Sequence, residues 1–141
     1  MFFPKLYVNI SLIFFLVPWF QDPLMIDKDG NTLVHLAARR GQTEIVRYFI
    51  GLANPKIPGL VNKNGETPLH CAAANGNLAV FKILSKKAKD MNPKANNGST
   101  PLHEACFNGN RLIFKYLITK VILLFFSNFV RNCKKNHKQC N

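Results

Sequence analysis

The feature that most constrains this chain is a pattern that occurs along it three times. The copies align on Thr32, Thr67 and Thr100, so the steps between them are 67 − 32 = 35 and 100 − 67 = 33 residues. Self-similarity at a period of about 20–50 residues indicates a repeat architecture, because each unit can bury its apolar face only against its neighbours. The sequence therefore predicts a stack of like units rather than one central core.

Each copy opens with a turn signal, Asp29-Gly30, Asn64-Gly65 or Asn97-Gly98. Such dipeptides favour tight turns because glycine adopts positive φ without steric cost. A second glycine follows eleven residues later in every copy, where a left-handed helix cap is expected. These second glycines are Gly41, Gly76 and Gly109.

Two helices are expected between one turn and the next. The threonine of each copy can cap the first helix, and Pro68 and Pro101 follow at the first helical position, whereas the first copy has Leu33 there. Small residues dominate this first, inner helix, so we expect close helix packing and interpret Cys71 and Cys106 as buried thiols. The second, outer helix has apolar residues at helical spacing. They are Ile45, Val46, Phe49 and Ile50; Val80, Phe81, Ile83 and Leu84; and Ile113, Phe114, Leu117 and Ile118.

Two tetrapeptides carry a family resemblance. Thr67-Pro68-Leu69-His70 and Thr100-Pro101-Leu102-His103 resemble the signature of the ankyrin repeat family. The resemblance covers residues 27–121 and implies an all-α repeat protein. It would be an ankyrin-type solenoid of stacked helix-turn-helix units joined by hairpin-like loops, with repeats at about 27–61, 62–94 and 95–121.

The recurring histidines do not predict a metal site. The resemblance implies that His35, His70 and His103 link adjacent repeats by hydrogen bonds, and their spacing along the stack keeps them from sharing one ion. Cys133, His137 and Cys140 supply three candidate zinc ligands, but a structural zinc site needs four. We therefore predict no metal and no cofactor.

The N-terminal segment, residues 1–26, contains an apolar run at 6–20 that admits several interpretations. It stands where the outer helix of an incomplete preceding repeat would stand. It also resembles a signal peptide, although no small-x-small cleavage site follows. As a membrane anchor it is short, with fifteen residues and an interrupting Pro18, where roughly twenty apolar residues are needed.

The C-terminal segment, residues 122–141, is apolar and then basic, with four lysines and arginines and no acid. The apolar run at 121–130 could continue the third outer helix and fold back, or it could contact a membrane whose anionic head groups attract the lysines. Both terminal segments change character abruptly, which is also what a partial or mispredicted gene model of a longer array would produce.

The charge and the missing motifs limit the function. The net charge of +12 favours acidic partners, but no nucleic-acid module is present, so no nucleic acid is expected. Nucleophile elbows, phosphate-binding glycine loops and paired carboxylates are absent from the sequence, so we predict no enzyme. Four cysteines in 141 residues do not suggest a disulfide scaffold, and the predicted compartment is the cytoplasm.

The predicted function is a non-catalytic protein–protein interaction module, a scaffold or adaptor. The alternative is a membrane-associated ankyrin-repeat protein anchored through its apolar ends. The resemblance implies a concave face, built from the tips and the inner helices, that binds another protein. Arg39 and Arg40 could grip carboxylates, and Phe107 could serve as an aromatic anchor. The predicted binding positions are Lys28, Asn31, Arg39, Arg40, Lys63, Glu66, Asn75, Asn96, Ser99, Phe107 and Asn108.

Overall fold

The described part of the chain consists of six α-helices and one short 3-10 helix. The computed structural model describes residues 24–51 and 56–137. The inner helices are α2 (Leu33–Arg40), α4 (Pro68–Ala74) and α6 (Pro101–Phe107), and the 3-10 helix η1 is Ile57–Gly59. The outer helices are α3 (Thr43–Gly51), α5 (Leu78–Ser85) and α7 (Arg111–His137).

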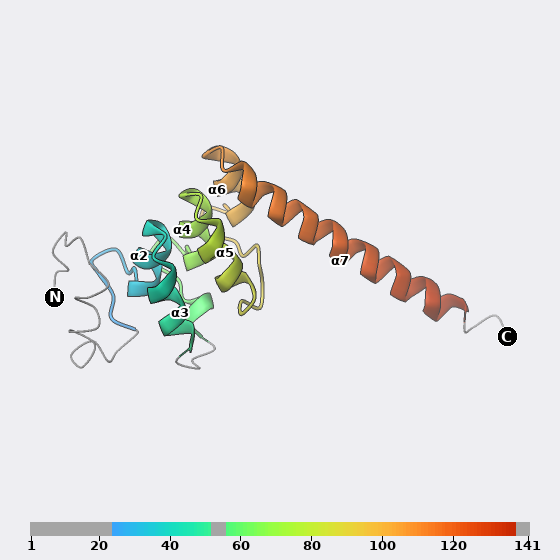
Figure 1. Cartoon of the computed structure of the whole chain (residues 1–141), viewed down its shortest axis with the longest axis horizontal. Helices are drawn as coiled ribbons and strands as arrows, with labels where there is room; N and C mark the ends of the chain where they lie inside the picture. The colour runs from blue at the N-terminus through green and yellow to red at the C-terminus, as the bar shows by residue number, and fades with distance from the viewer. Residues whose placement is uncertain (1–23, 52–55, 138–141) are drawn as a thin grey trace.

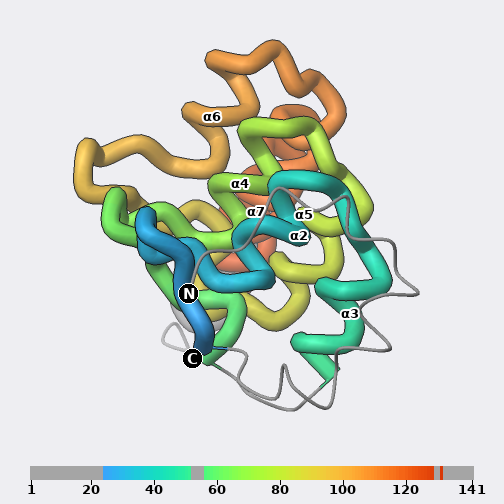
Figure 2. The backbone as a smooth tube through the Cα atoms, turned by 90° about the vertical axis from the view of Figure 1, so that its left-hand side faces the viewer, coloured from blue at the N-terminus to red at the C-terminus, as the bar shows by residue number. Residues whose placement is uncertain are grey.

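The helices form the stack that the repeat pattern predicts. The inner helices lie side by side with α4 between α2 and α6, and α5 lies between α3 and the start of α7 in a second row (Figure 1). Viewed from the N-terminal end, the successive helix pairs lie one behind another (Figure 2). The all-α solenoid is confirmed, and copies that follow one another in the sequence are also neighbours in space.

Local geometry explains where the inner helices begin and end. Each begins after a threonine in extended conformation, with proline at the first helical position in α4 and α6. Gly41 ends α2 at φ 70°, a left-handed conformation that glycine adopts without strain. Its backbone N–H donates to the Ala37 and Ala38 carbonyls at the end of the helix. The turn glycine and the cap glycine of every copy have positive φ, as the sequence indicated.

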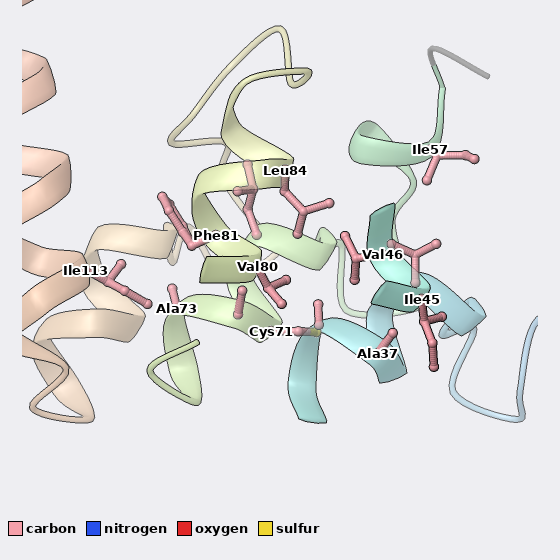
Figure 3. Close-up of a cluster of buried hydrophobic side chains, with 14 of the residues drawn as sticks. Ala37, Ile45, Val46, Ile57, Cys71, Ala73, Val80, Phe81, Leu84 and Ile113 are labelled. Carbon is pink, nitrogen blue, oxygen red and sulfur yellow. The ribbon is translucent and has the colours of Figure 1, made fainter. Parts of the chain in front are cut away.

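A continuous apolar core joins the two rows of helices. Val46, Phe81 and Leu84 point inward from the outer helices, and the small residues Ala37 and Cys71 let the inner helices approach closely (Figure 3). The second copy is the best covered, since every residue from Pro68 to Ala73 is buried. This distribution fits a repeat protein, in which each unit is stabilised by its neighbours.

The last helix does not stop at the predicted end of the third copy. α7 continues through residue 121 and reaches His137 as one helix that projects from the stack, without folding back (Figure 1). Its side chains from Val121 to Phe126 are exposed. No helix among the described residues is long and apolar enough to cross a membrane. The run at 6–20 lies outside the described residues.

Two side chains of the third copy are less covered than their counterparts in the second. The prediction that Cys106 is buried is wrong: Cys106 is exposed, although Ala73, at the same place in the second copy, is fully buried. Phe114, one of the apolar residues of the outer helix, is 39% exposed, whereas its counterpart Phe81 is 0% exposed. The local patterns are alike, but α6 and α7 cover the second copy and no helix of the described residues covers the third.

Candidate interaction surface

The hairpin-like tips are rigid because hydrogen bonds connect each one to the next. The Lys63 N–H donates to the Asp29 carbonyl over 3.1 Å, and the Asn96 N–H donates to the Asn64 carbonyl over 2.9 Å. The Asn96 amide also donates to the Lys63 carbonyl over 3.1 Å. The backbone of the tips is therefore fixed before any partner binds, which lowers the entropy cost of association.

Asn31 does not lie on the surface where it was predicted. Its side chain is only 3% exposed, because it packs between the tips of the first and second copies. Its Oδ1 accepts from the Asn62 amide at 2.9 Å, and its own amide donates to the Asp27 carboxylate at 3.1 Å. A buried polar side chain with satisfied hydrogen bonds stabilises the loops and offers no atom to a partner.

The Asp27 carboxylate closes the first tip. Its Oδ1 accepts from the N–H groups of Asp29 and Asn31, at 2.9 and 2.8 Å. Burial would raise the pKa of the Asp27 carboxyl, but the hydrogen bonds from Asn31 and Asp29 and the charge of Arg39 outweigh it and hold the pKa below its ordinary value. The ionised form is therefore the one that organises this turn.

Glu66 and Ser99 are also part of the loop structure. The Glu66 Oε2 accepts from the Asn62 amide at 2.8 Å, and the Ser99 hydroxyl donates to the Glu104 carboxylate at 2.6 Å. Both residues are half-buried. Their contact with a partner remains a prediction. Each side chain already makes a hydrogen bond within the loops, so a partner would have to bind its remaining exposed atoms.

The histidines of the first two copies join successive repeats, as the resemblance implied. The Nδ1 atom of His35 accepts from the Thr32 N–H at 3.1 Å, so the proton of the neutral ring is on Nε2. That Nε2–H donates to the Glu66 carbonyl at 2.9 Å, and the Nε2–H of His70 donates to the Ser99 carbonyl at 3.1 Å. Burial lowers the pKa of both rings despite these carbonyl contacts, so both are neutral at physiological pH.

Charged side chains project at the end of the first inner helix. Arg39 and Arg40 are exposed in the last turn of α2. Burial raises the pKa of the Cys71 thiol, although the nearby Arg39 guanidinium acts to lower that pKa. Lys28 and Lys63 are exposed at the neighbouring tips. This side of the stack is therefore basic at the first and second copies.

The corresponding positions of the second and third copies are polar or aromatic. Asn75 and Asn108 are exposed, and their amides donate to the Cys71 and Glu104 carbonyls at 3.0 and 2.9 Å, so both act as helix caps. Phe107 is 90% exposed at the end of α6. It borders a shallow hollow of about 480 Å³ lined also by Ser99, His103, Glu104 and Cys106.

Sequence reasoning missed the asparagines that begin the outer helices. The Asn77 amide donates to the Ala38 and Arg39 carbonyls at 2.7 and 3.1 Å, and Asn110 makes the same contacts to Ala73 and Ala74 at 2.6 and 2.9 Å. The recurrence of asparagine directly after Gly76 and Gly109 was the available signal. Each of these amides caps the inner helix of the preceding copy, α2 for Asn77 and α4 for Asn110, and so fixes the spacing between repeats.

The fold and the loop network together define a rigid helical solenoid of the interaction-module type. A family model described as ankyrin repeats in three copies matches residues 6–95 and again 52–125. The matches together span residues 6–125 of 141, and the chain belongs to the ankyrin-repeat family. No curated protein matches the chain. Ankyrin repeats serve as modules that bind other proteins.

Proposed function

We propose that this chain is a non-catalytic interaction module that binds an acidic surface of another protein through its inner-helix side. The observation that carries the proposal is the contrast between fixed loops and projecting side chains. The tips are held by backbone and amide hydrogen bonds, while Arg39, Arg40 and Phe107 project into solvent from inner-helix ends.

The chemistry of these side chains defines the partner. Arginine pairs with carboxylates through two parallel hydrogen bonds, and exposed aromatic rings are common anchors in interface pockets. The net charge of +12 increases the rate of association with an acidic partner, and this attraction weakens as salt is added. The partner is thus a protein with clustered carboxylates beside an apolar pocket.

Membership of a family whose repeats bind other proteins supports a scaffold rather than a catalyst. Among the described residues, every buried side-chain nitrogen and oxygen has a hydrogen-bond partner, and no three metal-ligating side chains converge. Cytoplasmic location is part of this proposal. The free thiols of Cys71 and Cys106 are the state that a reducing compartment maintains.

The test compares two triple variants with the wild-type chain in quantitative affinity capture. The site variant carries Arg39→Glu, Arg40→Glu and Phe107→Ala. The control carries Lys86→Glu, Lys87→Glu and Tyr48→Ala, which makes the same change of charge and loses one exposed ring, but on the outer-helix side.

Partners that depend on the inner-helix side should be recovered with the wild type and the control and lost with the site variant. Recovery of the same partners in the same amounts with the site variant would refute the proposal. Circular dichroism of all three proteins establishes that each is folded.

A further inference from the structure

The part of α7 that projects beyond the stack is an apolar surface exposed to solvent (Figure 1). Six consecutive side chains, at residues 121–126, are each between 48% and 75% exposed. The two most exposed of them are the rings of Phe125 and Phe126. A contiguous exposed apolar patch marks a site of interaction with an apolar surface.

The side chains of this segment are sorted by helix face. At about 100° per residue, Ile122 and Phe125 lie within about 40° of the direction opposite to Lys120. Ser127 and Arg131 lie within about 20° of the Lys120 direction itself. The helix therefore has a basic face and an apolar face. The apolar face of α7 consists of Ile118, Val121, Ile122, Phe125 and Phe126.

Contacts with the stack fix the direction of each face. The Lys120 Nζ lies 5.7 Å from the centre of the Tyr116 ring, and the Tyr116 hydroxyl lies 3.3 Å from the Ser85 hydroxyl of α5. The buried side chains of Ile113 and Leu117 lie within about 60° of the same direction. The basic face is thus on the side of the repeats, and the apolar face is on the side away from them.

The charges along α7 are all positive where the structure describes them. Arg111, Lys115, Lys120 and Arg131 are exposed, and the sequence contains no aspartate or glutamate after Glu104. Two copies of this helix side by side would bring like charges together, which is unfavourable. An anionic surface is the complementary one.

The width of the apolar surface favours lipid over a groove in a protein. Around the helix axis the exposed apolar side chains extend from Val121 to Leu123 through an arc of about 200°. Leu124 lies outside this arc, about 40° from Lys120. A stripe of about 100° is enough for a helix that packs on one protein surface. A wide apolar face opposite lysine and arginine is typical of helices that lie in a membrane interface.

Charges at both ends of the apolar run determine how it can enter a membrane. Residues 121–130 extend over about 15 Å, about half of the roughly 30 Å of hydrocarbon in a bilayer. End-on insertion would carry Arg131 to the middle of the bilayer, where a charge is costly. A helix parallel to the surface keeps Lys120 and Arg131 at the level of the head groups while its apolar side chains enter the acyl region.

We infer that α7 binds the surface of an anionic membrane and lies in its plane, with the apolar face in the lipid. Lys120 and Arg131 contact the anionic head groups, and the repeats remain on the water side of the helix. The side chains of Arg39 and Arg40 take no part in this contact. It therefore adds a second kind of binding to the one proposed for the inner-helix side.

Vesicle co-sedimentation of the full chain tests the binding. Vesicles of phosphatidylcholine with phosphatidylserine as the minority lipid are compared with vesicles of phosphatidylcholine alone. The wild type should bind mainly the vesicles with phosphatidylserine, and added salt should weaken this binding. Phe125→Ser with Phe126→Ser should lower the binding about tenfold or more, since two large apolar side chains are lost. The matched control, Tyr48→Ser with Phe107→Ser, removes two exposed rings outside α7 and should bind as the wild type.

Three results of this experiment overturn the inference. The first is a wild type that binds neither kind of vesicle, or both kinds equally. The second is equal binding by the Phe125→Ser, Phe126→Ser variant. The third is a wild type that associates without lipid in sedimentation equilibrium and becomes a single chain in that variant, which would assign the apolar face to self-association.

Fluorescence quenching tests the orientation of the helix. The cysteines other than the buried Cys71 are changed to serine, and one chain each receives Ile122→Cys, Phe125→Cys or Ser127→Cys, labelled with a fluorescent dye. Lipids brominated in the acyl chain should quench the dyes at 122 and 125 to a similar degree and the dye at 127 only weakly. Quenching that increases steadily from 122 to 127 would indicate end-on insertion and overturn the in-plane arrangement.

Discussion

The cross-repeat histidine bond allows a sharp stability test, because the chain contains both a complete and an incomplete version of it. His70→Ala removes a buried ring that caps α4 at Thr67 and donates to the Ser99 carbonyl. His103→Ala removes the same cap at Thr100 and no cross-repeat bond.

The magnitudes follow from these contacts. Loss of the cap costs each variant about 1 kcal/mol. His70→Ala additionally loses one hydrogen bond, about 1 kcal/mol, and leaves a cavity that costs about 1 kcal/mol more. The Ser99 carbonyl keeps its bond from the Ala95 N–H, so no acceptor is left buried and unpaired. We expect unfolding free energies lowered by about 3 kcal/mol for His70→Ala and about 1 kcal/mol for His103→Ala.

Urea unfolding followed by far-UV circular dichroism measures both losses at a pH well above the histidine pKa. A difference of about 2 kcal/mol between the variants is the expected result. Equal losses would refute the reasoning, because they would mean that the cross-repeat bond and the burial of the ring contribute nothing to the stack.

Three further predictions use the same kind of comparison. Phe81→Ala should cost about 3 kcal/mol or more in urea unfolding and Phe114→Ala clearly less, since only the first ring is fully buried; equal costs would contradict this. The two buried histidines have lowered folded pKa values, so their unfolded forms take up protons first and stability should fall as pH drops below 6.5. The slope is at most about 1.4 kcal/mol per pH unit for each ring, and a flat pH profile of unfolding would disagree. Iodoacetamide labelling followed by peptide mass spectrometry should modify Cys106 quickly and Cys71 only on unfolding, because Cys71 is buried and its burial raises the pKa of the thiol; similar rates would contradict the assigned burial.

Much of the fold could be predicted because its local signals coincide with its tertiary contacts. The turn at Asn64-Gly65, the proline that starts α4 and the glycine that follows it each have a conformational cause that acts within a few residues. Repetition then placed like helices beside one another. These features would specify the same stack wherever the sequence occurred.

The candidate site was less predictable because a polar residue at a tip has two possible roles. Asn31 and Arg39 were both predicted to face a partner, yet Asn31 is buried and Arg39 projects into solvent. The difference depends on Asn62 of the next copy, which packs over Asn31 and donates its amide to the Asn31 Oδ1 over 2.9 Å. A pattern within one copy contains no information about that neighbour.

The sequence by itself determined the period, the turns, and the threonines and glycines between which the inner helices begin and end. The tertiary structure alone decided which copies of those features are covered. Ala73 and Cys106 occupy the same position, as do Phe81 and Phe114, yet one member of each pair is buried and the other exposed. The physical reason is that burial in a stacked array depends on the presence of the next repeat, which is a property of the neighbour and not of the residue.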